Sequence, residues 1–164
     1  GIGRTYQIVK PFSNLTVLDN TVVGALLLDS NVKRAREKAR EVVHTVGLDY
    51  RMDVVGADLN LPELKRLELA RALATQPQLL LLDEVMAGLN PADSDKMIEL
   101  VREINQSGVT IIIIEHVMKA IMRLSHRIYV LNQGKLISQG TPEEVSNDPE
   151  VIRSYFGEKR YAKN

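Results

Sequence analysis

The sequence contains no cysteine among its 164 residues. It therefore has no disulfide framework, no cysteine-ligated metal site and no thiol nucleophile, and it suits a reducing compartment. Basic and acidic residues number 21 each, and this zero net charge argues against a protein that binds nucleic acid through bulk positive charge. The apolar stretches, such as the one near 109–114, are far too short to span a membrane, and no signal peptide is evident.

The chain does contain a run of four leucines that ends in two carboxylates, at 79–84. A short apolar run after the turn signal at 76–78 predicts a β-strand buried on both faces of a parallel sheet. The acids come where this strand leaves the core, at the edge where open α/β sheets bind ligands. Because side chains alternate along a strand, Asp83 and Glu84 are expected to point apart and to have different roles. Two solvated acids that open a loop would give the same pattern.

Apolar periodicity and turn residues predict an α/β order of elements along the rest of the chain. The predicted helices cover 16–27, 32–46, 60–75, 93–106, 117–124, a short segment from 141, and 148–156, and the predicted strands cover 3–9, 79–82, 109–114 and a hairpin of 127–131 with 135–139. The strand, helix and strand between 79 and 114 form a βαβ unit, whose crossover should be right-handed.

A second pair of polar residues, Glu115 and His116, follows the strand predicted at 109–114. Neighbouring parallel strands end at the same edge of a sheet, so this pair is expected to face the same site as Asp83 and Glu84. One acid of such a group can bind Mg²⁺, a second can accept a proton from an attacking water, and an imidazole can contact charge that develops on a phosphate. This combination indicates metal-assisted phosphoryl transfer.

Three consecutive motifs, at 70–77, 79–84 and 88–91, resemble the nucleotide-binding subunit of ABC transporters. The segment 1–7 is similar to the stretch that ends in that family's Q-loop glutamine, and His116 is similar to its switch histidine. The resemblance covers nearly the whole chain, and the order and separation of the motifs make it specific. Within the family, 8–12, 85–91 and 140–145 resemble the subunits of branched-chain amino-acid importers.

The resemblance implies a role for each matching residue. Asp83 corresponds to the Walker B aspartate that holds Mg²⁺, and Glu84 to the catalytic glutamate that orients or deprotonates the water. Gln7 corresponds to the Q-loop residue that contacts Mg²⁺ and the water, and His116 to the residue that contacts the γ-phosphate. Asn90 corresponds to the D-loop region that faces a second subunit. Without the family, Gln7 would be an ordinary amide at a strand end and His116 a surface histidine.

The resemblance also implies an architecture: part of a P-loop NTPase fold of the ABC type, with a mostly parallel sheet flanked by helices, an α-helical subdomain and a C-terminal β-hairpin. The expected parts are a Q-loop segment (1–9), a helical subdomain (10–76), a catalytic sheet portion (77–157) and a tail (158–164). The implied cofactors are ATP and Mg²⁺. The implied partners are transmembrane permease subunits and a second ATP-binding subunit, with no nucleic acid, and the implied location is cytoplasmic, peripheral on the inner face of the cell membrane.

The first departure from the family is the lack of a phosphate-binding loop. The pattern G-x-x-x-x-G-K-[ST], whose backbone amides and lysine hold phosphates, does not occur, and the one Gly-Lys pair, at 134–135, is followed by Leu136. In the family this loop precedes the Q-loop, and this sequence begins at Gly1. We therefore expect a C-terminal portion that alone binds ATP very weakly and does not hydrolyse it.

The second departure lies in the segment that aligns with the family's signature motif, L-S-G-G-Q, which offers a helix N-terminus to the γ-phosphate held by the opposite subunit. Here that segment is Leu59, Asn60, Leu61, Pro62 and Glu63. Pro62 has no N–H to donate, Leu61 adds bulk, and Glu63 places a negative charge where a phosphate would bind. Asn60 can supply the side-chain contact of the usual serine, or Asn60 and Glu63 can simply cap the helix.

Two other functions remain open on the sequence alone. One is a non-hydrolytic interaction module that binds membrane subunits without turnover, although Gln7, Asp83, Glu84 and His116 all match the catalytic pattern. The other is an ABC ATPase without a transporter, which the neutral charge disfavours.

Overall fold

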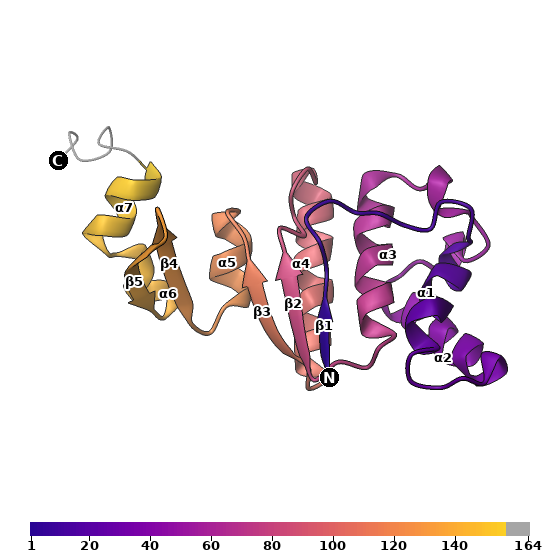
Figure 1. Cartoon of the computed structure of the whole chain (residues 1–164). Helices are drawn as coiled ribbons and strands as arrows, with labels where there is room; N and C mark the ends of the chain where they lie inside the picture. The colour runs from indigo at the N-terminus through magenta and orange to yellow at the C-terminus, as the bar shows by residue number, and fades with distance from the viewer. Residues whose placement is uncertain (157–164) are drawn as a thin grey trace. The chain divides into compact units, whose positions relative to one another are not determined.

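The computed structural model describes residues 1–156, with side chains described as far as 154, so the predicted tail at 158–164 lies outside the described residues. The chain forms two compact units that divide between His116 and Val117. Each unit is built around its own strands (Figure 1). None of the helices in the described part of the chain is long and apolar enough to cross a membrane.

The first unit contains a parallel sheet in the order β1, β2, β3. These strands span Ile2–Arg4, Leu79–Asp83 and Thr110–Ile114. The helix α4, Pro91–Gln106, connects β2 to β3, and β2 pairs in parallel with both of its neighbours. The βαβ unit predicted from the sequence is confirmed. As its crossover helix, α4 packs on one face of the sheet, and Figure 1 shows it behind β1 and β2.

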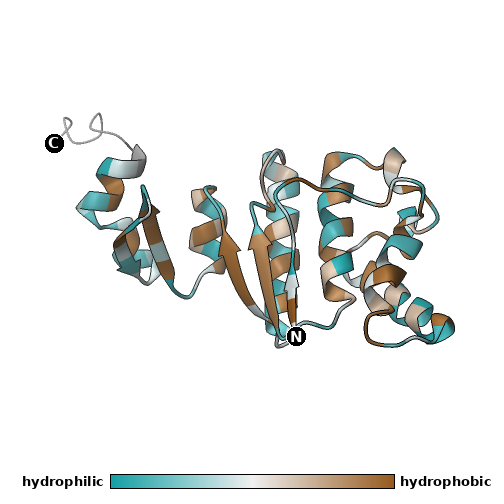
Figure 2. Cartoon of the chain, in the orientation of Figure 1, coloured by the Kyte–Doolittle hydropathy of each residue, from teal (hydrophilic) through white to brown (hydrophobic). Residues whose placement is uncertain are grey.

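The two faces of this sheet differ in burial. Leu80 and Leu82 point to one face and are buried, whereas Ile112 and Ile114 point to the other and are 54% and 63% exposed. The prediction of a strand buried on both faces at 79–82 is therefore wrong for one face in the described residues, where Leu79 and Leu81 are only half-buried. An apolar run gives the side chains of a strand but does not show what covers them. Figure 2 shows β2 and β3 in brown, as hydrophobic strands.

The helices α1, α2 and α3 form the rest of the first unit (Figure 1). They span Val17–Ala25, Val32–Thr45 and Leu61–Leu73, with short 3₁₀ turns at Asp49–Arg51 and Gly56–Asp58. They match the three predicted helices at 16–27, 32–46 and 60–75. Their shared core is small and aliphatic, and consists of Leu18, Val22, Ala25, Ala35, Ala39 and Ala74.

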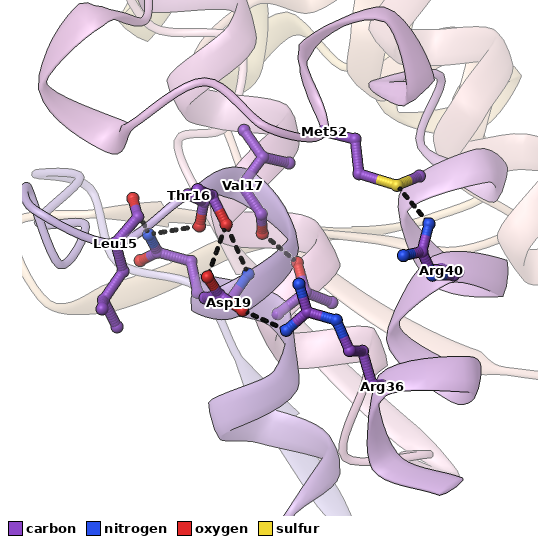
Figure 3. A network of polar contacts seen from close by, with 9 residues as sticks. Leu15, Thr16, Val17, Asp19, Arg36, Arg40 and Met52 are labelled. Atoms are coloured by element: carbon purple, nitrogen blue, oxygen red, sulfur yellow. Dashed lines mark hydrogen bonds and ion pairs between the residues drawn. The ribbon is translucent and has the colours of Figure 1, made fainter. Parts of the chain in front are cut away.

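A polar network fixes the start of α1 against α2 (Figure 3). The Thr16 hydroxyl accepts from the Asp19 N–H at 3.0 Å, and Arg36 of α2 pairs with the Asp19 carboxylate at 2.5 Å. The hydrogen bond from Thr16 and then the nearby Arg36 lower the pKa of Asp19 against the opposing effect of burial. Thr16 is therefore the N-cap of α1, and the carboxylate that it orients joins two helices.

The strand predicted at 3–9 ends much earlier than expected. β1 stops at Arg4, and although the Thr5 N–H still donates to the Leu81 carbonyl, the backbone groups of Tyr6 and Gln7 bond to side chains of α3 instead. The β-forming residues of this segment favour a strand, but long-range contacts to α3 decide where it ends.

The second unit is built on an antiparallel hairpin. β4, Ile128–Asn132, pairs with β5, Lys135–Gly140, as the sequence predicts. Around it lie α5, α6 and α7, which span Met118–Leu124, Pro142–Ser146 and Pro149–Phe156. The core of this unit consists of Ile128, Val130, Val145 and Val151, and a capping box between Thr141 and Glu144 starts α6.

Candidate functional site

Asp83 and Glu84 diverge at the carboxyl end of β2. Asp83 is the last residue of the strand. Glu84 has a positive φ of 47°, a backbone conformation that is unfavourable for residues other than glycine. The Glu84 N–H donates to the Ile114 carbonyl at 2.9 Å, so β3 holds the turn. Backbone strain of this kind gathers at functional sites.

The Glu84 carboxylate lies between two residues from distant parts of the chain. The Gln7 side-chain amide donates to one of its oxygens at 2.6 Å, and Nδ1 of His116 lies 3.7 Å from the other. Glu84 is partly buried, whereas His116 is largely exposed. The structure thus brings together three of the residues singled out from the sequence, and leaves the imidazole open toward solvent.

Asp83 faces a residue that the sequence analysis did not single out. One guanidinium nitrogen of Arg4 lies 3.4 Å from the Asp83 carboxylate, and the Arg4 guanidinium also lies 5.0 Å from the centroid of the Tyr6 ring. Arg4 ends β1, which pairs with β2. No local pattern marks such a residue, because its proximity to Asp83 depends on a strand pairing between residues far apart in the sequence.

Glu115 does not join this cluster. One of its carboxylate oxygens accepts from the Met86 N–H at 2.7 Å, and the other accepts from the His116 N–H at 3.3 Å. The expectation that Glu115 faces the same site as Asp83 and Glu84 is therefore replaced by a supporting role. Glu115 fixes the loop that follows Glu84, because it binds a backbone amide two residues further on.

The segment aligned with the signature motif forms a complete helix cap. The Glu63 N–H donates to the Asn60 side chain, and the Asn60 N–H donates to the Glu63 carboxylate, both at 3.0 Å. Glu63 also accepts from Arg51 and Tyr50. Burial raises the pKa of Glu63, but the hydrogen bonds from Asn60, Arg51 and Tyr50 outweigh burial, and its pKa is lowered. Glu63 is therefore held as a carboxylate at the N-terminus of α3.

Asn90 caps a second helix close to that segment. Its side-chain oxygen accepts from the Asp93 N–H at 2.9 Å at the start of α4, and Leu61 packs so closely on Gly88 that a Cβ there would lie 2.8 Å from it. A cavity of about 300 Å³ lies beside the start of both helices and is lined by Gly47, Tyr50, Asn60, Pro62, Glu63, Arg66, Leu89, Asp93, Lys96 and Met97. The residues at 60–63 and 90 thus form a second group, distinct from the carboxylates of β2.

The group of residues around the end of β2, which includes Gln7, Asp83, Glu84 and His116, suits a magnesium ion that arrives with phosphates. Asp83 offers carboxylate oxygens and Gln7 an amide oxygen, which are the hard donors that Mg²⁺ prefers. In the described part of the chain, no group of three or more His, Cys, Asp or Glu residues could hold a metal ion. Mg²⁺ bound to a nucleotide needs only one or two carboxylates from the protein, so Asp83 fits this use and a closed protein cage is not needed.

The elements and the site together define a class: an α/β protein with carboxylates, an amide and an imidazole at the carboxyl edge of a parallel sheet. A family model described as "ABC transporter" matches residues 1–87, and one described as "Branched-chain amino acid ATP-binding cassette transporter" matches 135–160. The chain therefore belongs to the ABC transporter family, whose shared function is that of an ATP-binding, ATP-hydrolysing subunit.

Individual relatives agree with this assignment. The chain is 40% identical to the high-affinity branched-chain amino acid transport ATP-binding protein LivG of Salmonella typhimurium, over 96% of this chain and 68% of LivG. It is 34% identical to the lipopolysaccharide export system ATP-binding protein LptB of Haemophilus influenzae, over 97% of this chain and 66% of LptB. The crystal structure of the ADP conformation of MJ1267, an ATP-binding cassette of an ABC transporter, superposes with a TM-score of 0.81 at 30% identity. The superposition covers 96% of this chain and 69% of MJ1267. The resemblance and fold class inferred from the sequence are confirmed, and the individual residue roles stay predictions.

Proposed function

We propose that the chain serves an importer of branched-chain amino acids, as the subunit that hydrolyses ATP to drive transport. The likeness to LivG is stronger than the likeness to LptB. The family model matched at 135–160 is that of the branched-chain amino-acid cassettes, and this segment lies in the second unit, apart from the carboxylates. The comparison with whole relatives and the family model at 135–160 therefore support the same class of cargo.

The position of the Glu84 carboxylate, between the Gln7 amide and the His116 imidazole, is the observation that carries the proposed chemistry. Glu84 accepts a proton from the attacking water, and Gln7 fixes the orientation of the carboxylate and of the water. His116 contacts the charge that develops on the γ-phosphate. Asp83 would hold Mg²⁺, which when bound neutralises phosphate charge and polarises the phosphoryl group.

The proposed assembly follows from the second group of residues. Asn60, Leu61, Pro62 and Glu63 at the start of α3, with Asn90 at the start of α4, would face a second ATP-binding subunit across the cavity that they line or flank. Transmembrane permease subunits would hold the pair at the inner face of the cell membrane. No nucleic acid is part of this assembly, which agrees with the net charge of zero.

A LivG chimera tests this proposal directly. The chimera carries this chain in place of the matching segment of Salmonella typhimurium LivG, and it is expressed in a strain that lacks LivG. We expect the chimera to restore uptake of a radiolabelled branched-chain amino acid. Glu84→Gln in the chimera should lower uptake and ATPase rate by about 100-fold or more, because the proton acceptor is lost. The matched control is Glu37→Gln, which removes a carboxylate exposed on α2 and should leave both rates unchanged.

Two results would contradict the proposal. A chimera that reaches the membrane with the permease subunits but neither hydrolyses ATP nor supports uptake would favour the non-hydrolytic interaction module instead. An ATPase rate that survives Glu84→Gln would show that another group accepts the proton.

A further inference from the structure

Helix α3 buries two charged side chains on one face. Lys65 and Glu68 are only 4% and 7% exposed, and residues three apart on a helix point the same way. Burying a charge is costly unless the charge is paired or hydrogen-bonded. A stabilising role in the core would favour apolar residues here, so the partners of these two groups show what they do.

The partners of both side chains lie in the loops that carry Gln7 and Glu84. The Glu68 carboxylate accepts from the Tyr6 N–H at 2.7 Å. The Lys65 ammonium donates to the Gln7 carbonyl and to the Glu84 carbonyl, at 3.1 Å each. One buried cation therefore bridges the backbones of two residues whose side chains meet at 2.6 Å, although they are 77 positions apart in the sequence.

The contact to Glu84 supports its strained backbone. The Glu84 N–H is held by the Ile114 carbonyl, and its own carbonyl accepts from Lys65 and from the Ala87 N–H at 3.1 Å. Both polar groups of the left-handed residue are thus bonded. Loss of the Lys65 donor would leave the partly buried Glu84 carbonyl with one partner fewer, and a partly freed backbone relaxes toward the ordinary φ region.

We propose that Lys65 is a positioning residue for the catalytic centre. Its ammonium ties the loops of Gln7 and Glu84 to α3, and so sets the approach of the Gln7 amide to the Glu84 carboxylate. Glu68 holds the same Gln7 loop one residue earlier. The start of α3 carries the segment at 60–63, so a shift of α3 would reach the water-activating carboxylate through Lys65. This inference rests on the proposed function of Glu84, but the contact itself can be tested separately.

Three variants separate hydrogen bonding from charge and packing. Lys65→Met keeps a long unbranched side chain and removes every donor. Lys65→Gln is neutral but restores N–H donors to the same place. Lys33→Met removes an exposed lysine of α2 and serves as the matched control.

Hydrogen exchange on the 164-residue chain tests the contact without any assay of ATP. In Lys65→Met, we expect the Glu84 amide to exchange about tenfold faster, as the loss of one buried hydrogen bond predicts. The Val101 amide in α4 should change much less, which separates local release from global unfolding. Lys65→Gln should restore much of the protection and Lys33→Met should have no effect. Equal exchange at Glu84 in Lys65→Met and the unsubstituted chain would overturn the contact.

Steady-state kinetics in the LivG chimera test the catalytic consequence. We expect Lys65→Met to lower kcat by about 10- to 100-fold, since a small misplacement of a catalytic group costs this much, with KM for ATP little changed and partial rescue by Lys65→Gln. An unchanged kcat, or a loss confined to KM, would overturn the positioning role. An inactive unsubstituted chimera would instead count against the proposed function, and hydrogen exchange would then decide on the contact alone.

Discussion

Glu84 adopts a backbone conformation that costs a non-glycine residue free energy. Its φ of 47° places Cβ too close to the following carbonyl, at a cost of roughly 1–2 kcal/mol. A glycine would remove this strain but would carry no carboxylate. The proposed role of Glu84 as proton acceptor would account for a carboxylate here, and the contacts from Ile114 and Lys65 hold the strained backbone in place.

Glu68 should make the stability of the fold depend on pH in a direction opposite to that of most carboxylates. Burial raises the pKa of Glu68, against the smaller lowering by the Tyr6 N–H and by the charges of Lys65 and Arg71. The folded chain then keeps this proton to a higher pH than the unfolded chain, whose carboxyl titrates near 4.5. The stabilising contribution is complete below that pH and is lost as pH rises through the raised pKa.

The variant Glu68→Gln isolates this effect. It keeps an oxygen that can accept from the Tyr6 N–H but it cannot titrate. Urea unfolding of both proteins from below pH 4.5 to neutral pH should show that the unsubstituted chain loses stability relative to Glu68→Gln as pH rises. A constant difference across that range would mean that burial does not raise this pKa.

At the scale of elements, the helix starts were the most predictable features, because their signals are local. Thr16, Asn60 and Thr141 each cap a helix through a residue three positions later, and this spacing can be read in the sequence. The carboxylates at the end of β2 were equally visible, since an apolar run ended there.

The features that escaped prediction depend on residues far apart in the chain. β1 ends at Arg4 because Lys65 and Glu68 bind the loop beyond it, and a lone lysine or glutamate within a helix gives no pattern that reveals a distant partner. The exposure of Ile112 and Ile114 likewise depends on what covers the sheet. The position of His116 beside Glu84 follows from the strand-edge argument, because two neighbouring parallel strands end at the same edge of the sheet, whereas its approach to Gln7 depends on the loop that follows β1 and was expected only through the family resemblance.

Restoring a backbone donor at the start of α3 should raise the ATPase rate. The capping box uses the N–H groups of Asn60 and Glu63. Pro62 lies between these two residues and has no backbone N–H to donate. In the LivG chimera, Pro62→Gly supplies a free donor at the helix N-terminus, which in the proposed assembly would point toward a phosphate on a second subunit. We expect kcat to rise, by up to about tenfold, because donors at developing phosphate charge are worth this much or more.

The measurement is the steady-state ATPase rate of the chimera with and without Pro62→Gly. Circular dichroism serves as the control, because glycine at this position also lowers helix stability. An unchanged rate in a folded variant would mean that the segment at 60–63 only caps α3 and that its lost amide is unimportant for hydrolysis.

At the scale of the whole molecule, the first unit brings together both ends of its own sequence. Gln7 precedes α1, whereas His116 is the last residue before the second unit, and both meet Glu84. The first unit therefore has to fold as a whole before the cluster of Gln7, Glu84 and His116, to which we assign water activation, exists. The groups of this cluster are acids, an amide and an imidazole, and they are suited to activating water and to holding a metal ion rather than to enclosing a chain of phosphates.

A site with groups for activating water but none for enclosing the phosphates predicts weak nucleotide binding by the 164-residue chain itself. The sequence contains no G-x-x-x-x-G-K-[ST], so it lacks the amide cradle and lysine that bind the β- and γ-phosphates. Losing two charge-assisted contacts of this kind costs about 100-fold in affinity. Isothermal titration with Mg-ATP should therefore give a Kd at least about 100-fold higher for this chain than for the LivG chimera, in samples whose circular dichroism shows that both are folded. Equal affinities would mean that residues within this chain hold the phosphates, and the cavity beside Asn60 and Glu63 would then be the first place to look for them.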